Sequence, residues 1–122
     1  MKLEAFFSDD HEARQAALEA CLHVADHERF TLAGEVAIVA KRAADALAHA
    51  DENGGTTTGH STELGRAAVA LSILRGEVAK NCLHRIADER SYAVKSALAR
   101  ALRETRTGEG QSVRGDLLCD ED

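Results

Sequence analysis

Apolar residues recur at the spacing of an α-helix along most of this chain, and no proline interrupts them. Proline is absent from all 122 residues, alanine is abundant, and aromatic residues make up 3% of the sequence. A chain without proline has no obligatory helix breakers, and small apolar side chains let helix axes approach one another closely. Both features predict an all-α fold.

The first half of the chain contains two of four main helical stretches. N-cap oxygens at residues 8–10 precede the first stretch, which we expect over about residues 9–26. It is predicted to end before a polar corner at residues 26–29. The second stretch covers about residues 31–51, where Ile38 widens the apolar face.

The second half contains the other two stretches. Ser61 or Thr62 is expected to cap the third, and Gly76 interrupts its pattern at a place where it can divide into two shorter helices. The last stretch is expected over about residues 91–105. Between the halves, residues 53–60 include three glycines, a composition that favours neither helix nor strand and predicts a mobile loop.

One phrase of the sequence occurs twice. Cys-Leu-His-Val-Ala-Asp-His-Glu-Arg at residues 21–29 returns as Cys-Leu-His-Arg-Ile-Ala-Asp-Glu-Arg at residues 82–90. A two-helix unit cannot bury its apolar face alone, and stacking two copies solves that problem. We therefore expect one domain over residues 1–106, a compact bundle of four main helices built as two related helical hairpins, with halves at 1–52 and 61–106.

Residues 107–122 differ in composition from the rest. They are rich in Gly, Ser, Arg and acidic residues and end in Asp120-Glu121-Asp122. This composition predicts an acidic, disordered tail, in which Leu117 and Leu118 form an apolar pair able to dock locally.

Two segments share a further pattern, an acidic turn followed by a basic residue and an alanine-rich run. The pattern is found in residues 8–26, which include Ala16-Ala17-Leu18, and in residues 88–105, which include Ala97-Leu98-Ala99. It resembles the second-helix consensus of HEAT-like repeats. The resemblance implies a short HEAT-like stack as an alternative fold, Asp and Arg side chains that brace neighbouring repeats, and a stacked surface that binds other proteins.

Charge and cysteine content limit the class of protein. Lys and Arg number 15 against 21 Asp and Glu, and the net charge of −6 argues against nucleic-acid binding, which needs clustered positive charge. No apolar run is long enough to cross a bilayer, and the first residues become acidic too soon for a signal peptide. Three cysteines are too few for a disulfide scaffold. We expect a cytoplasmic protein with reduced thiols and no membrane partner.

A divalent metal site is the first chemical hypothesis. Glu19, His23 and His27 are spaced four apart, so they share one face if a single helix carries them, and imidazole and carboxylate groups bind zinc and similar ions. Cys21 and Cys82 add sulfur ligands if the two phrases pair. Against this, no C-x-x-C or H-E-x-x-H pattern is present, and a cysteine on an alanine-rich face is usually a small core residue.

Two other motifs are weaker. Residues 54–61 match the Walker A spacing, but His60 replaces the lysine and the segment follows a helix instead of a strand, so we interpret it as a linker. Acidic and basic residues recur at both copies of the repeated phrase, where we expect structural braces between helices: Asp26, Arg29, Asp88 and Arg90.

These observations favour a non-catalytic helical protein-interaction module that self-associates, most simply as a homodimer, with no cofactor and no catalytic residues. The alternative is a helical domain that binds a small ligand or a divalent metal through Glu19, His23 and His27, with His84 as a further candidate. A third hypothesis is an enzyme whose active site uses the acidic residues at the two copies of the repeated phrase.

Overall fold

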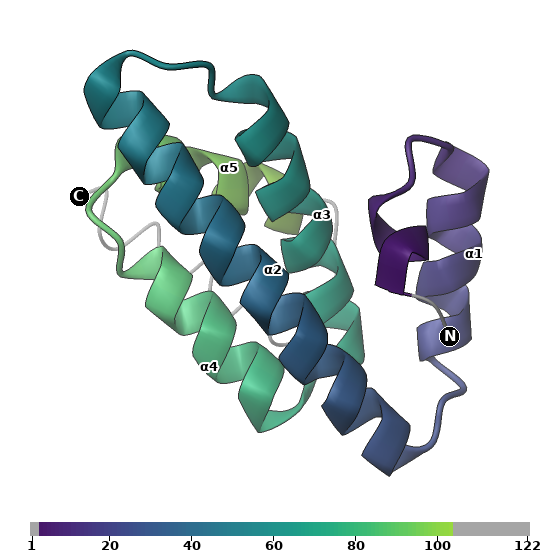
Figure 1. Ribbon diagram of the computed structural model, residues 1–122. Coiled ribbons are helices and arrows are strands. Elements are labelled where there is room, and N and C mark those ends of the chain that lie inside the picture. The colour runs from purple at the N-terminus through teal and green to yellow at the C-terminus, as the bar shows by residue number, and fades with distance from the viewer. Residues whose placement is uncertain (1–2, 104–122) are drawn as a thin grey trace.

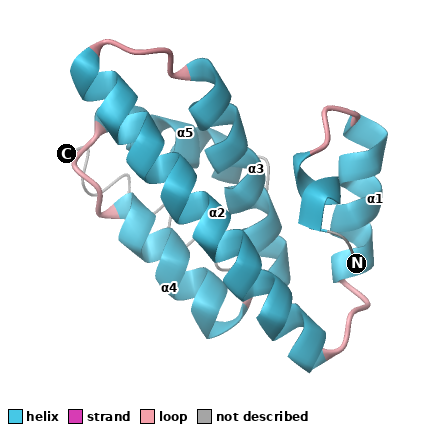
Figure 2. Cartoon of the chain, in the orientation of Figure 1, coloured by secondary structure: helices cyan, strands magenta, loops and turns pink. Residues whose placement is uncertain are grey.

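The computed structural model describes residues 3–103, and every regular element in that range is a helix (Figures 1 and 2). A short 3-10 helix, η1, precedes five α-helices. Their bounds are Leu3–Phe7 for η1, His11–Cys21 for α1, Asp26–Asn53 for α2, Thr58–Leu74 for α3, Gly76–Ala87 for α4 and Tyr92–Leu102 for α5. The prediction of an all-α fold is confirmed for the described residues. The expectations for residues 107–122 concern residues outside this range.

The third predicted stretch is two helices, divided where Gly76 interrupts the pattern. Arg75 separates α3 from α4 with φ 62° and ψ −169°, and Gly76 has φ 88°. Backbone with positive φ cannot continue a right-handed helix, so the chain reverses direction here (Figure 1). The described part of the chain therefore has five α-helices in place of four main ones.

The turn between the first two helices lies earlier than the sequence predicted. α1 begins after Asp10, whose side chain accepts a hydrogen bond from Glu12 N at 3.1 Å, and it ends at Cys21. α2 then starts at Asp26 instead of near Thr31. Asp26 and Glu28 occupy the first turn of α2, where negative charge is favoured by the helix dipole. The residues predicted to form a polar corner are therefore helical.

The two copies of the repeated phrase occupy different environments. Cys21 is the last residue of α1, and Leu22 after it is 61% exposed. Cys82 lies in the middle of α4, and Leu83 after it is fully buried. Both copies include the end of one helix and lead into the next, but the second copy begins about one helical turn further inside its helix.

The glycine-rich segment is a shorter connection than expected. Gly54 adopts a left-handed conformation with φ 71° at the end of α2, and Gly55 N donates to Ala50 O at 2.8 Å, which ends the helix. α3 already begins at Thr58. The connection between α2 and α3 therefore spans residues 54–57.

The core lies between α2, α3, α4 and α5. α2 packs along α3 and α4, and α5 packs mainly on α3. Several alanines at these contacts are almost fully buried, which brings the helix axes close together. The largest fully buried core side chains include Val36, Leu47, Leu64, Leu71, Leu74, Leu83, Val94, Leu98 and Leu102. No helix in residues 3–103 combines the length and the apolar character needed to cross a bilayer.

η1 and α1 form an N-terminal arm that lies beside α3 (Figure 1). Phe6 is 2% exposed and anchors the arm in the core. At the far end of the arm, Arg29 Nη2 donates to Cys21 O at 3.4 Å and joins the end of α1 to the start of α2.

Candidate functional site

An open groove of about 370 Å³ lies between α2 and α4, and we name it the α2–α4 groove. Ala37 and Ala44 are small side chains on its α2 wall. The Cys82 thiol of α4 donates a weak hydrogen bond to Ala37 O at 3.8 Å across the groove floor. The complete lining is Ala37, Ile38, Lys41, Ala44, Val78, Asn81, Cys82, Arg85, Ile86 and Glu89.

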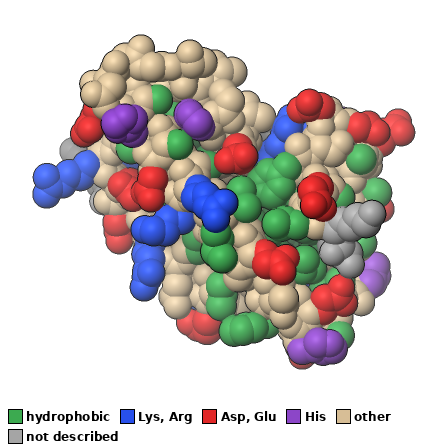
Figure 3. All heavy atoms as spheres, viewed as in Figure 1, with side chains coloured by type: hydrophobic (Ala, Val, Ile, Leu, Met, Phe, Trp, Pro, Cys, Tyr) green, Lys and Arg blue, Asp and Glu red, His purple; other side chains and the backbone are tan. Residues whose placement is uncertain are grey.

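Two large hydrophobic side chains of α2 are exposed to solvent, and one of them belongs to the lining of this groove. Ile38 lines it and is 56% exposed, and Phe30 is 68% exposed. Phe30 precedes Ala37 by seven residues, or about two helical turns, so it lies on the same side of α2 as the groove. Figure 3 shows hydrophobic side chains exposed along α2, toward α4 and toward α1. A set of exposed hydrophobic side chains beside a groove is typical of an interaction surface.

The charges around the groove are mixed and do not activate a nucleophile. Lys41, Arg85 and Glu89 line it together with Cys82. Burial raises the pKa of the Cys82 thiol above its ordinary value of 9.0, although Arg85 and Lys41 lower it in part. The thiol therefore stays protonated at neutral pH, and a protonated thiol is a poor nucleophile and metal ligand.

The residues of the metal hypothesis are distributed over two helices and the turn between them. Glu19 is exposed on α1, His23 is exposed in the turn, and His27 is exposed in the first turn of α2. No single helix carries all three, so the condition for a shared face is not met. Within residues 3–103, no group of three or more His, Cys, Asp or Glu side chains is placed to hold a metal ion. Metal binding stays a prediction, and elemental analysis of the purified protein tests it.

The residues predicted as braces also differ from one another in their surroundings. Arg29 reaches Cys21 O, as described above, but Asp26 is exposed and the N-cap of α2 is Ala25. Asp88 follows the end of α4, and Arg90 lies exposed in the turn before α5.

A second hollow of about 300 Å³ lies between α1, α3 and α5, and we name it the arginine groove. Phe6, Leu18 and Val69 contribute apolar surface to it, and Arg14, Arg66 and Arg100 surround this surface. The remaining lining residues are His11, Gln15, Ser61, Thr62, Gly65, Ala97 and Ala101.

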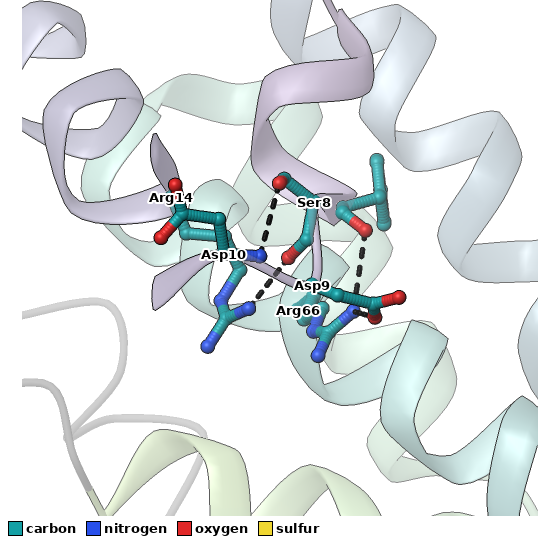
Figure 4. A network of polar contacts seen from close by, with 6 residues as sticks. Ser8, Asp9, Asp10, Arg14 and Arg66 are labelled. Atoms are coloured by element: carbon teal, nitrogen blue, oxygen red, sulfur yellow. Dashed lines mark hydrogen bonds and ion pairs between the residues drawn. The ribbon is translucent and has the colours of Figure 1, made fainter. Parts of the chain in front are cut away.

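Two of these arginines are held in place by the N-terminal arm (Figure 4). Arg66 Nη1 donates to Phe7 O at 3.2 Å and to Asp9 Oδ1 at 3.2 Å, and Arg14 Nη1 donates to Ser8 O. A guanidinium has five N–H donors, so these bonds orient each group while leaving it able to bind an anion.

Sequence reasoning identified neither of these surfaces. It placed Ile38 on a widened apolar face of its helix, and that width is the signal that could have pointed to the α2–α4 groove. The arginine groove gave no such signal, because Arg14 and Arg66 are far apart in the sequence and come together through the packing of the arm on α3. Comparison of the chain with family models, with curated proteins and with solved structures gives no match.

Proposed function

We propose that this protein is a non-catalytic helical interaction module that self-associates through the α2–α4 groove. The observation that carries the proposal is the exposure of Ile38 and Phe30 on the groove side of α2. Complete burial of a side chain of this size contributes about 1.5–3 kcal/mol, and a symmetric dimer buries each residue twice.

The mixed charge of the groove supports a second copy of the chain as the occupant. In a two-fold dimer the same surface appears on both partners, so each copy must supply both members of any charge pair. Lys41 and Arg85 provide positive charge and Glu89 provides negative charge within one groove. This pattern allows basic groups of one copy to face an acidic group of the other.

The bundle and the N-terminal arm have different roles in this function. Helices α2 to α5 form the bundle that presents the groove, with η1 and α1 attached at its side. A reducing, cytoplasmic environment suits such a surface, because Cys82 in its centre then stays a thiol and adds small apolar surface.

Light scattering coupled to size-exclusion chromatography tests self-association over a series of protein concentrations. We expect a mass that rises from one chain toward two chains. Ile38→Glu places a charge in the interface at two symmetric positions and is expected to weaken association by at least about a hundredfold, or tenfold per site. Because Ile38 is 56% exposed, the variant keeps its fold, which circular dichroism verifies.

Tyr92→Glu is the matched control. Tyr92 is 78% exposed at the start of α5 and does not line the α2–α4 groove. We expect it to associate like the unmodified protein. A mass of one chain at every concentration overturns the proposal, and so does an equal loss of association in both variants.

A further inference from the structure

We propose that residues 116–122 of this chain bind in the arginine groove. This inference concerns a surface separate from the α2–α4 groove and does not depend on self-association. Its starting point is a groove whose lining combines apolar side chains with three arginines.

The chemistry of this segment complements the groove. Residues 116–122 read Asp-Leu-Leu-Cys-Asp-Glu-Asp, which places two leucines between acidic groups and contains no basic residue. The leucines match the apolar surface of Phe6, Leu18 and Val69. The acidic side chains match the guanidinium groups that surround it, since carboxylates are the preferred partners of arginine in paired hydrogen bonds.

Chain connectivity also favours this occupant. α5 ends at Leu102, and Arg100 and Ala101 in its last turn line the groove. The 13 residues of 103–115 span at most about 45 Å when fully extended. A folded domain of about 100 residues has a radius of gyration of about 13 Å, so the length of the connection does not prevent binding. A tether of this kind supplies an effective concentration in the millimolar range, which is enough to populate a weak contact.

The surroundings of the arginines indicate which interactions support the contact. Asp9, which is not a lining residue, already pairs with Arg66, and His11 and Arg14 both line the groove. Exposed ion pairs are individually weak and are screened by salt. Burial of Leu117 and Leu118 is therefore the larger contribution to the free energy of binding. The groove that receives the segment is lined by residues of the N-terminal arm, α3 and α5.

Disulfide trapping in the full chain tests the proposal, because Cys119 lies inside the segment. Gln15→Cys places a thiol in the groove lining, and Ala16→Cys places one on the outer face of the same helix. Each variant is oxidised mildly with a copper–phenanthroline complex, and peptide mass spectrometry follows the bond between Cys119 and the introduced thiol. We expect this bond to form at least about tenfold faster in Gln15→Cys than in Ala16→Cys. Equal rates overturn the proposal.

Charge variants separate groove binding from the effect of the tether. Arg100→Glu is expected to lower the trapping rate in the Gln15→Cys background at least about threefold, and the additional change Asp120→Arg to restore it. Trapping is also expected to slow between about 50 mM and about 500 mM salt. An unchanged rate in Arg100→Glu overturns the proposal, as does a disulfide that joins two chains instead of one.

Discussion

At the scale of single residues, Arg75 holds a backbone conformation that suits glycine. Its φ of 62° and ψ of −169° lie in a region that side chains disfavour by about 1–3 kcal/mol. Replacement by glycine relieves this strain, but it also adds about 0.5–1 kcal/mol of backbone entropy to the unfolded chain. We predict that Arg75→Gly raises the free energy of unfolding by about 1 kcal/mol, measured by urea denaturation.

The neighbouring glycine provides the control for this prediction. Gly76 has φ 88° and nothing within 4 Å of an added Cβ, so an alanine there meets strain without a steric clash. Gly76→Ala is expected to lower the free energy of unfolding by about 1 kcal/mol. Destabilisation by Arg75→Gly contradicts the strain argument.

Because of Cys21, the folding stability of the protein depends on pH in the alkaline range. Burial raises the pKa of its thiol from 9.0 to about 11, against a smaller opposing effect of Arg29. Between these values the unfolded chain has released the proton that the folded chain retains, so stability falls as the pH rises from about 9 toward 11. Below about pH 9 both states keep the proton and the effect disappears.

The measurement compares the unmodified protein with Cys21→Ala in urea at about pH 8 and at about pH 10. Every other side chain is the same in both proteins, so the comparison isolates the effect of Cys21. We predict that the unmodified protein loses more stability between the two pH values than Cys21→Ala does. Parallel losses contradict the prediction.

At the scale of helices, α2 and α5 differ in how they begin. Ser91 caps α5: its hydroxyl accepts a hydrogen bond from Val94 N at 3.4 Å and lies 3.5 Å from Asp51 Oδ2. Ala25 occupies the N-cap of α2 with φ −66° and ψ 154°, the extended conformation that a capping residue adopts, but it has no side-chain acceptor.

This difference predicts opposite changes in the free energy of unfolding for substitutions at the two N-caps, which thermal or urea unfolding measures. Ala25→Ser is expected to raise the free energy of unfolding by about 0.5–1 kcal/mol, because a hydroxyl at this position can accept from an N–H of the first turn. Ser91→Ala is expected to lower it by about 1 kcal/mol. If both changes shift stability in the same direction, the assignment of these N-caps is incorrect.

Sequence patterns predicted the helices better than their ends. The break at Gly76 was visible because glycine interrupts an apolar pattern. The turn before α2 was not, because Asp26 and Glu28 suit a turn as well as they suit the first turn of a helix. The repeated phrase was misleading for a related reason: Leu22 and Leu83 both follow a cysteine and precede a histidine, but tertiary packing exposes the first and buries the second.

At the scale of the whole molecule, periodicity cannot show which helices become neighbours. The exposure of Ile38 depends on where α4 lies against α2, and the two helices are separated in sequence by the whole of α3. The arginine groove depends in the same way on the packing of α1 and η1 beside α3. Composition and spacing therefore predicted the fold class, whereas both candidate surfaces required coordinates.

The unbroken length of α2 has a consequence for how the fold is connected. Its 28 residues form a rod of about 42 Å without an interruption. One end is fastened to the N-terminal arm through Arg29, and the other meets the start of α5 at Asp51. A single uninterrupted helix therefore joins the contact with the N-terminal arm to the contact with the start of α5.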